Sequence, residues 1–170
     1  IYGWGEATVE WKTRAVVGAI EDIKPLLIGK DPRNIKQNFQ IMTKHGFWKM
    51  GVIGMTAISG IEHALWDILG KSLNTPVWQL LGGKVRDKIK IYTHLGLGDM
   101  QAVYKDTLET SKLNDHAMSL VNNGYNSFKV VFIPFTHYTN SIDNLKKVNS
   151  LMSSLRETVG DKIDIMVDFH

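Results

Sequence analysis

The segment MTAISGIEHALWDILGKSL, residues 55–73, carries the strongest structural signal in the chain. Its apolar residues recur at the three- and four-residue spacing of an α-helix, so the segment predicts one long helix. Because a second apolar flank lies beside the first, two sides of this helix must be covered, and we expect it to be deeply packed. The first stripe is Ile58, Ile61, Leu65 and Ile68, and the second flank is Ala57, Ala64 and Trp66.

Three further elements are predicted ahead of this helix. Residues 2–11 are rich in aromatic and β-branched side chains and predict a strand or one arm of a hairpin. Residues 15–27 have helical spacing. Asp31-Pro32 then predicts the N-cap and first residue of a second helix, which ends near His45.

After Gly83 the pattern changes to alternating strands and helices. The strands are near-continuous apolar runs, which is typical of a parallel sheet whose strands are joined by helices. The predicted fold class is therefore α/β, with a domain boundary near residues 83–87. Strands are predicted at residues 88–95, 126–133 and 163–170, and helices at residues 100–123 and 142–158.

The composition argues against several classes of protein. The 170 residues include 20 Lys and Arg against 17 Asp and Glu, and a net charge of +3 makes no basic surface for nucleic acid. There is no cysteine, which excludes disulfides and cysteine-ligated zinc. No uninterrupted apolar run is long enough for a membrane span, and the first residues do not resemble a signal peptide.

Asp168 and His170 end the third predicted strand. Side chains alternate along a strand, so these two share one face and Phe169 takes the other. The carboxyl ends of parallel strands carry the active sites of α/β barrels and open sheets. There a carboxylate can bind a metal and an imidazole can transfer a proton. The alternative is a solvated carboxylate with a histidine packed nearby.

Lys129 interrupts the apolar run of the second predicted strand. A charged side chain in a buried strand must face a polar cavity, where it could neutralise a carboxylate substrate. On an edge strand the same lysine would only extend into water, and the sequence leaves both interpretations open. His94, at the end of the first predicted strand, could face the same cavity.

The segment His45-Gly46-Phe47-Trp48-Lys49-Met50-Gly51 places two aromatic side chains and a cation between glycines. Such a segment suits a mobile lid over a small polar ligand, with His45 and Trp48 as contacts. The alternative is a loop whose aromatic side chains only attach it to the domain core.

Several blocks of this sequence resemble the enolase superfamily. Tyr2-Gly3-Trp4-Gly5-Glu6-Ala7 resembles a strand of its N-terminal capping domain, and residues 57–68 resemble its helix with the pattern A-x-x-x-I-[DE]-x-A-L-W-D. The likeness continues through residues 70–83. Val167-Asp168-Phe169-His170 resembles the mandelate racemase subgroup, and most closely acid-sugar dehydratases of the D-galactonate dehydratase type.

This resemblance implies an enolase-type α+β capping domain followed by the first strands of a modified (β/α)-barrel. Residues 1–86 would be the capping domain without its first strand, and residues 87–170 the first three barrel strands. Because a full barrel needs roughly 250 residues, we expect the 170 residues to be part of a polypeptide of about 400.

The resemblance also implies roles for individual residues. Asp168 corresponds to the first ligand of an essential Mg²⁺, and His170 to the general acid that protonates the departing hydroxyl. Lys129 corresponds to a lysine near the substrate carboxylate. The segment His45–Val52 corresponds to the loop that closes over the substrate. The two remaining metal ligands and the general base would lie beyond residue 170.

The implied activity is that of a hydro-lyase. Removal of the proton α to the carboxylate of an aldonate, such as D-galactonate, D-gluconate or D-mannonate, gives an enediolate, and loss of hydroxide leads to a 2-keto-3-deoxy acid. Racemases of the subgroup carry a second lysine where Val131 stands, which favours dehydration. A racemase or cycloisomerase of the same superfamily, or a non-catalytic relative, is the alternative. We expect a cytoplasmic homo-oligomer that binds an acid sugar and neither nucleic acid nor membrane.

Overall fold

The computed structural model describes residues 1–96, 109–130 and 141–168 of the chain. The chain divides into two compact units, Ile1–Asp87 and Lys88–His170. Each unit has a hydrophobic core of its own, and each is described by itself.

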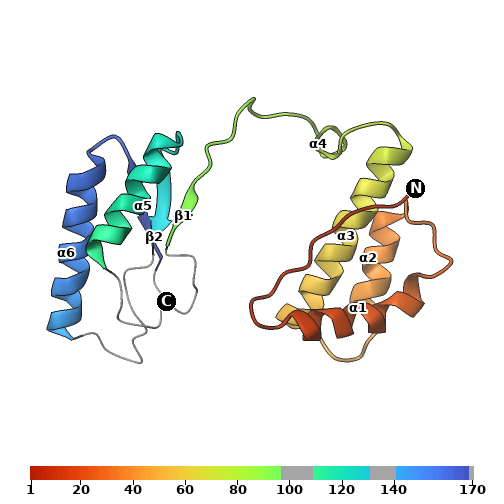
Figure 1. Cartoon of the computed structure of the whole chain (residues 1–170). Helices are drawn as coiled ribbons and strands as arrows, with labels where there is room; N and C mark the ends of the chain where they lie inside the picture. The colour runs from red at the N-terminus through yellow and green to blue at the C-terminus, as the bar shows by residue number, and fades with distance from the viewer. Residues whose placement is uncertain (97–108, 131–140, 169–170) are drawn as a thin grey trace. The chain divides into compact units, whose positions relative to one another are not determined.

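The first unit is built from helices (Figure 1). Apolar side chains from the three longer helices form its core, because each of those helices presents one apolar stripe. The helices are α1 (Thr13–Leu27), α2 (Ile35–Lys44), α3 (Val52–Ser72) and the short α4 (Val77–Leu80). The core residues are Val16, Ile23, Met42, Ala57 and Ile58.

Helix α3 is the long helix that the sequence predicts, and it begins three residues earlier than expected, after Gly51. Ala57 and Ile58 are fully buried against α1 and α2. Among the helices of the described ranges, α3 alone has the length and apolar content that a membrane span requires. Because its apolar stripe instead packs against neighbouring helices, it is the core helix of a folded unit, and a membrane location is not indicated.

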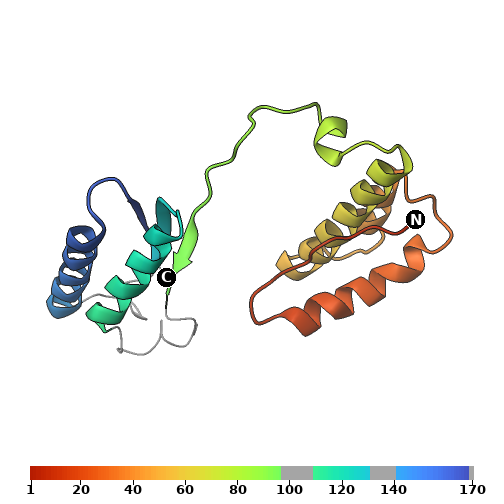
Figure 2. The same cartoon turned by 45° about the horizontal axis from the view of Figure 1, so that its top comes forward.

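The prediction of a strand at residues 2–11 is wrong. This segment is extended but forms no strand, since no described segment of the first unit pairs with it. It crosses α3 instead, as both views show (Figures 1 and 2). A β-carbon on Gly3 would lie 2.1 Å from the Ala64 carbonyl oxygen, and one on Gly5 1.8 Å from the Gly60 carbonyl oxygen. Only glycine at these positions allows the two backbones to approach so closely.

The start of α2 also differs from the prediction. The helix begins at Ile35 and not at Pro32, because the preceding residues form a turn. The Asp31 carboxylate accepts hydrogen bonds from the Arg33 backbone N–H at 2.9 Å and from the Arg33 guanidinium. An aspartate side chain that is hydrogen-bonded to the backbone N–H two residues later favours a turn over a helix.

In its described residues, the second unit is a three-stranded parallel sheet with two helices, which confirms a mixed α/β fold. β1 is shorter than the sequence predicts. Residues 88–92 precede β1 without a strand partner among the described residues, and the ends of the other two predicted strands fall partly on residues 131–133 and 169–170, which lie outside the described ranges. The elements are β1 (Thr93–Leu95), α5 (Thr110–Asn122), β2 (Ser127–Val130), α6 (Ile142–Val159) and β3 (Asp164–Val167), in the strand order β1-β2-β3.

Both crossover helices cover the same face of this sheet. Phe128 and Val130 point to one face of β2 and are fully buried. The core that contains them includes Leu113 and Ala117 of α5 and Leu155 of α6. The two helices lie side by side in both views (Figures 1 and 2). The opposite face of the sheet is therefore covered by neither helix.

Candidate functional site on the open face of the sheet

The strand register gathers polar side chains on the face that the helices leave open. His94 of β1 pairs with Lys129 of β2, and Lys129 pairs with Met166 of β3. Residues in register across neighbouring strands point to the same face. These three residues therefore form one row, which we call the open-face row. Lys129 is only partly exposed there, although Phe128 and Val130 beside it in sequence are buried.

Asp168 joins this row from the carboxyl end of β3. Its backbone N–H donates to the Val130 carbonyl oxygen at 3.0 Å, which extends the ladder one residue beyond the strand. Asp168 lies two residues after Met166, so its side chain points to the same face of the sheet. Lys129 Nζ donates a hydrogen bond to Asp168 Oδ2 at 2.7 Å. The side chains of Lys129 and Asp168 are 30% and 34% exposed, so solvent screens this ion pair only in part.

His94 occupies the β1 end of the open-face row and is exposed. A β-carbon on Gly96 would lie 2.7 Å from His94 Cε1. The imidazole therefore folds over the backbone of Gly96, toward the carboxyl end of the strand. The register places His94 on the same side of the sheet as Lys129, which contact with a shared cavity would require.

A second ion pair lies at the amino end of β3. Lys90 contacts Asp164, and the ammonium group lowers the pKa of the Asp164 carboxyl below its ordinary value, chiefly through the hydrogen bond. The Ser127 hydroxyl donates to the Ile91 carbonyl oxygen at 2.8 Å and joins the β1 end to β2. Sequence analysis missed this pair, because no local pattern relates Lys90 to Asp164, which lie far apart in the sequence.

The predicted lid belongs to the first unit. Phe47 and Trp48 are 92% and 84% exposed and meet edge to face, with ring centroids 5.4 Å apart. They contact each other and not the buried core, which argues against the alternative of a loop attached by its aromatic residues. His45 Nδ1 lies 2.8 Å from the Met42 carbonyl oxygen, and since a carbonyl only accepts, this nitrogen carries the proton. His45 Nε2 is not used in that bond.

Three predicted features fall outside the described residues: His170, Phe169 and Val131. Within residues 1–96, 109–130 and 141–168, no three His, Asp or Glu side chains gather closely enough to hold a metal ion. Asp168 thus offers one hard oxygen donor of the kind that Mg²⁺ prefers, and it does not make a complete site.

One surface hollow of the first unit has a volume of about 580 Å³. Glu6 and Thr8 of the N-terminal segment line it, and Glu6 accepts a hydrogen bond from the Thr8 hydroxyl at 3.1 Å. The rest of its lining comes from α3: Val52, Met55, Thr56, Ser59 and His63. The hydrogen bond between Thr8 and Glu6 is exposed to solvent, and this lining by itself indicates no particular reaction.

Comparison with known proteins matches most of the first unit to a family model. Residues 1–82 match the N-terminal domain of the mandelate racemase/muconate lactonizing enzyme family. Residues 1–82 of the 170 are therefore similar to a domain of the mandelate racemase/muconate lactonizing enzyme type.

Solved structures resemble the whole chain. A candidate dehydratase from Zymomonas mobilis is 30% identical over 98% of this chain, with a TM-score of 0.87. An enolase superfamily member from Salmonella Typhimurium is 32% identical over 100% of it, with a TM-score of 0.85. An enolase from Agrobacterium radiobacter, a candidate galactarate dehydratase with bound sodium and L-malate, is 29% identical over 98%, with a TM-score of 0.79. This chain spans 46%, 48% and 40% of those three chains.

Proposed function

We propose that the complete protein is a Mg²⁺-dependent acid-sugar dehydratase, a hydro-lyase that converts an aldonate such as D-galactonate, D-gluconate or D-mannonate into a 2-keto-3-deoxy acid. The observation that carries this proposal is the contact between Lys129 and Asp168 on the face of the sheet that neither crossover helix covers. The similarity to candidate dehydratases from Zymomonas mobilis and Agrobacterium radiobacter supports the same class of reaction.

The one-sided arrangement of helices supports a barrel. In a doubly wound sheet, the crossover helices cover both faces, whereas in a (β/α)-barrel every helix lies outside and the inner face is lined by side chains. Here α5 and α6 share one face, so the open-face row would line the interior near the carboxyl ends of the strands. We infer that residues 87–170 are the first three strands of such a barrel and that residues 1–86 are its capping domain.

Asp168 fits the chemistry of a Mg²⁺ ligand, because its carboxylate is a hard oxygen donor on the open face. Substrate, water and side chains other than those in the described ranges would complete the coordination. When bound, the ion would neutralise charge that develops on the substrate carboxylate as the neighbouring proton leaves.

The chain's own residues would bind the substrate and help hydroxide depart. Lys129, with its positive charge near Asp168, would hold the substrate carboxylate. A general base other than the residues named here would take the proton from C2, and His170 would donate its own proton to the hydroxyl on C3, which then leaves as water. The enol formed then tautomerises to the keto acid. His94 would contact the substrate from β1.

The segment around His45 and Trp48 would close over the distal end of the substrate. Its exposed aromatic pair and the unused His45 Nε2 support this role, since a closing loop must present side chains to the ligand. We further propose a cytoplasmic homo-oligomer with a small-molecule partner and no bound nucleic acid.

The test uses the complete polypeptide with Mg²⁺ and a panel of aldonic acids. We expect keto-acid formation from at least one of them, its loss when the metal is chelated, and a decrease of 100-fold or more, on the order expected for removal of a metal ligand, for Asp168→Asn. No keto acid from any aldonate would contradict the proposal. Deuterium exchange at the α-carbon without loss of water would favour the racemase alternative.

A further inference from the structure

We propose that Asn123 is a site of spontaneous deamidation, and that the cap at the carboxyl end of α5 sets how fast it reacts. Asn123-Gly124 is the one Asn-Gly pair in the sequence. The inference concerns the second unit alone and does not rest on the proposed function. It assigns to this chain a covalent modification whose only co-reactant is water.

The reaction joins a side chain to the backbone of the next residue. The backbone nitrogen of Gly124 attacks the side-chain carbon Cγ of Asn123 and loses its proton, and the side-chain nitrogen leaves as ammonia. The product is a cyclic imide, the succinimide. Water then opens this ring at either of its carbonyl groups, which gives aspartate or isoaspartate. Glycine has no β-carbon, so as the following residue it hinders the attack least.

The structure leaves the side chain of Asn123 accessible for this reaction. Asn123 is exposed, and within the described ranges its side chain makes no hydrogen bond. A β-carbon placed on Gly124 would have nothing within 4 Å, so no neighbouring group crowds that side of the Gly124 backbone. Asn149 supplies a matched comparison, because it is also exposed and precedes another small residue, Ser150, but lies inside α6.

The same turn restrains the nitrogen that must attack. The Gly124 N–H donates to the Val121 carbonyl oxygen at 2.9 Å, and the Tyr125 N–H donates to the Leu120 carbonyl oxygen at 3.1 Å. With Gly124 at a φ of 91°, these bonds form a Schellman cap. The Gly124 nitrogen must leave its carbonyl partner before it can attack Cγ. Deamidation therefore proceeds through local opening of the cap, which costs less free energy than unfolding the whole unit.

Deamidation would in turn weaken the cap. Both cap hydrogen bonds span residue 123, and isoaspartate places an additional methylene in the main chain between their donors and acceptors. Either product also carries a negative charge at the carboxyl end of α5, where the helix dipole disfavours it. The net charge of the chain falls by one from +3, so ion-exchange chromatography can separate the product.

The first measurement follows the complete polypeptide, held for days in mildly alkaline buffer, by peptide mapping with tandem mass spectrometry. Asn123 should change to aspartate and isoaspartate. Asn149 should change roughly tenfold more slowly or less, because a helix interior opens less readily than a helix end. Asn123→Gln should resist the change, since its longer side chain closes a ring less readily. An unaltered Asn123, or equal rates at Asn123 and Asn149, would overturn the inference.

The second measurement tests the role of the cap. Unfolding the chain in urea should speed the reaction at Asn123 by roughly the factor by which folding slows hydrogen exchange of the Gly124 amide, since both need the same opening. Asn123→Asp, which is one of the two products, should exchange its Gly124 and Tyr125 amides roughly two- to fivefold faster, the range expected for an unfavourable charge at a helix end. The Leu155 amide of α6 should not change. Equal rates at Asn123 in the folded and unfolded chain, or unchanged exchange in Asn123→Asp, would contradict control by the cap.

Discussion

Gly5 shows how much of the first unit depends on a single missing side chain. A β-carbon at this position would lie 1.8 Å from the Gly60 carbonyl oxygen, and one on Gly60 would lie 2.5 Å from the Ala7 side chain. The two glycines thus face each other where the N-terminal segment crosses α3. Neither has a positive φ, so the requirement is for space and not for an unusual backbone.

Gly5→Ala should therefore destabilise the first unit by about 1–3 kcal/mol, the usual cost of overpacking a closed contact. Gly18→Ala is the matched control. Gly18 lies in α1 with nothing within 4 Å of its β-carbon position, and alanine there should stabilise the helix by about 0.5–1 kcal/mol. Urea unfolding measures both. Equal stability of the two variants would contradict the packing described.

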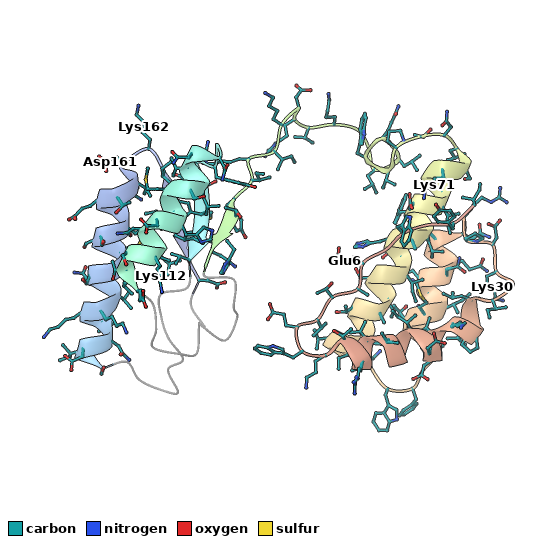
Figure 3. The ribbon with its side chains drawn as sticks, viewed as in Figure 1. Glu6, Lys30, Lys71, Lys112, Asp161 and Lys162 are labelled. Carbon is teal, nitrogen blue, oxygen red and sulfur yellow. The ribbon has the colours of Figure 1, made fainter. Side chains whose placement is uncertain are left out.

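At the scale of elements, the N-terminal segment is held to α3 by a polar latch. The Trp4 backbone N–H donates to Asp67 Oδ2 at 2.8 Å. Lys71 Nζ donates to Asp67 Oδ2 at 2.8 Å and to the Tyr2 carbonyl oxygen at 3.1 Å. The Lys71 ammonium also lies 4.9 Å from the centroid of the Tyr2 ring. Figure 3 shows Lys71 near the end of α3, beside this segment. The latch gives an extended segment without a strand partner a fixed position.

The latch should weaken in acid. Hydrogen bonds from Lys71 and then from the Trp4 N–H lower the pKa of Asp67 below its ordinary value of 3.8. A carboxyl with a lowered folded-state pKa stabilises the fold above its unfolded pKa, and this contribution is lost as the pH falls through the folded value. Hydrogen exchange of the Trp4 amide, corrected for intrinsic rate, should show constant protection from pH 7 to about pH 5 and a decrease below about pH 4.

Two variants test this interpretation of the latch. Asp67→Asn keeps an oxygen for the Trp4 N–H but loses the charge, so its protection should be lower than in the wild type and independent of pH. Glu21→Gln removes an exposed pair with Lys24 on α1 and should leave the Trp4 amide unchanged. Wild-type protection that persists to pH 3 would show that Asp67 does not control the segment.

The elements themselves were predictable to different degrees. The spacing of Ile58, Ile61 and Leu65 predicts α3 because a helical stripe is a local property of the sequence. The prediction of a strand at residues 2–11 is wrong because a strand must pair with another strand. The sequence of the segment alone does not show whether such a partner exists. Helix α2 begins later than predicted, at Ile35, because the Asp31 carboxylate accepts a hydrogen bond from the Arg33 backbone N–H and so stabilises a turn.

At the scale of the whole molecule, the sequence predicts where the candidate site lies, but it does not predict which of its side chains are in contact. Lys129 and Asp168 both fall near the carboxyl ends of apolar strands, which indicates one edge of a parallel sheet. Their hydrogen bond depends on the register that pairs Lys129 with Met166, and no local pattern fixes that register. The glycines around Trp48 only suggest a lid, which stays a prediction, and the exposure of Trp48 required the structure.

The whole chain also exposes apolar side chains that a stable monomer would cover. Val85, Ile89 and Ile91 are 90%, 73% and 64% exposed in the stretch before β1. The 170 residues expressed alone should therefore self-associate, because exposed apolar stretches and unpaired strand edges promote aggregation. Sedimentation velocity should show species larger than 19.2 kDa.

The double variant Ile89→Thr/Ile91→Thr should reduce that association. The control Ile28→Thr removes a single apolar side chain that is 71% exposed in the first unit, and it should have little effect. A monodisperse monomer of the unaltered chain would contradict the prediction.

The placement of both crossover helices on one face of the sheet also governs how the sequence can vary. Neighbouring residues in β2 are constrained by different interactions. Phe128 and Val130 must pack against α5 and α6, whereas Lys129 is constrained by the groups that it binds on the opposite face. A saturation scan through residues 128–130 should therefore show different effects at neighbouring positions. Abundance in the cell would drop at Phe128 and Val130, whereas at Lys129 abundance would persist while ligand affinity changes. Stability could then be changed at Phe128 and Val130, and ligand selectivity at Lys129, within the same four-residue strand.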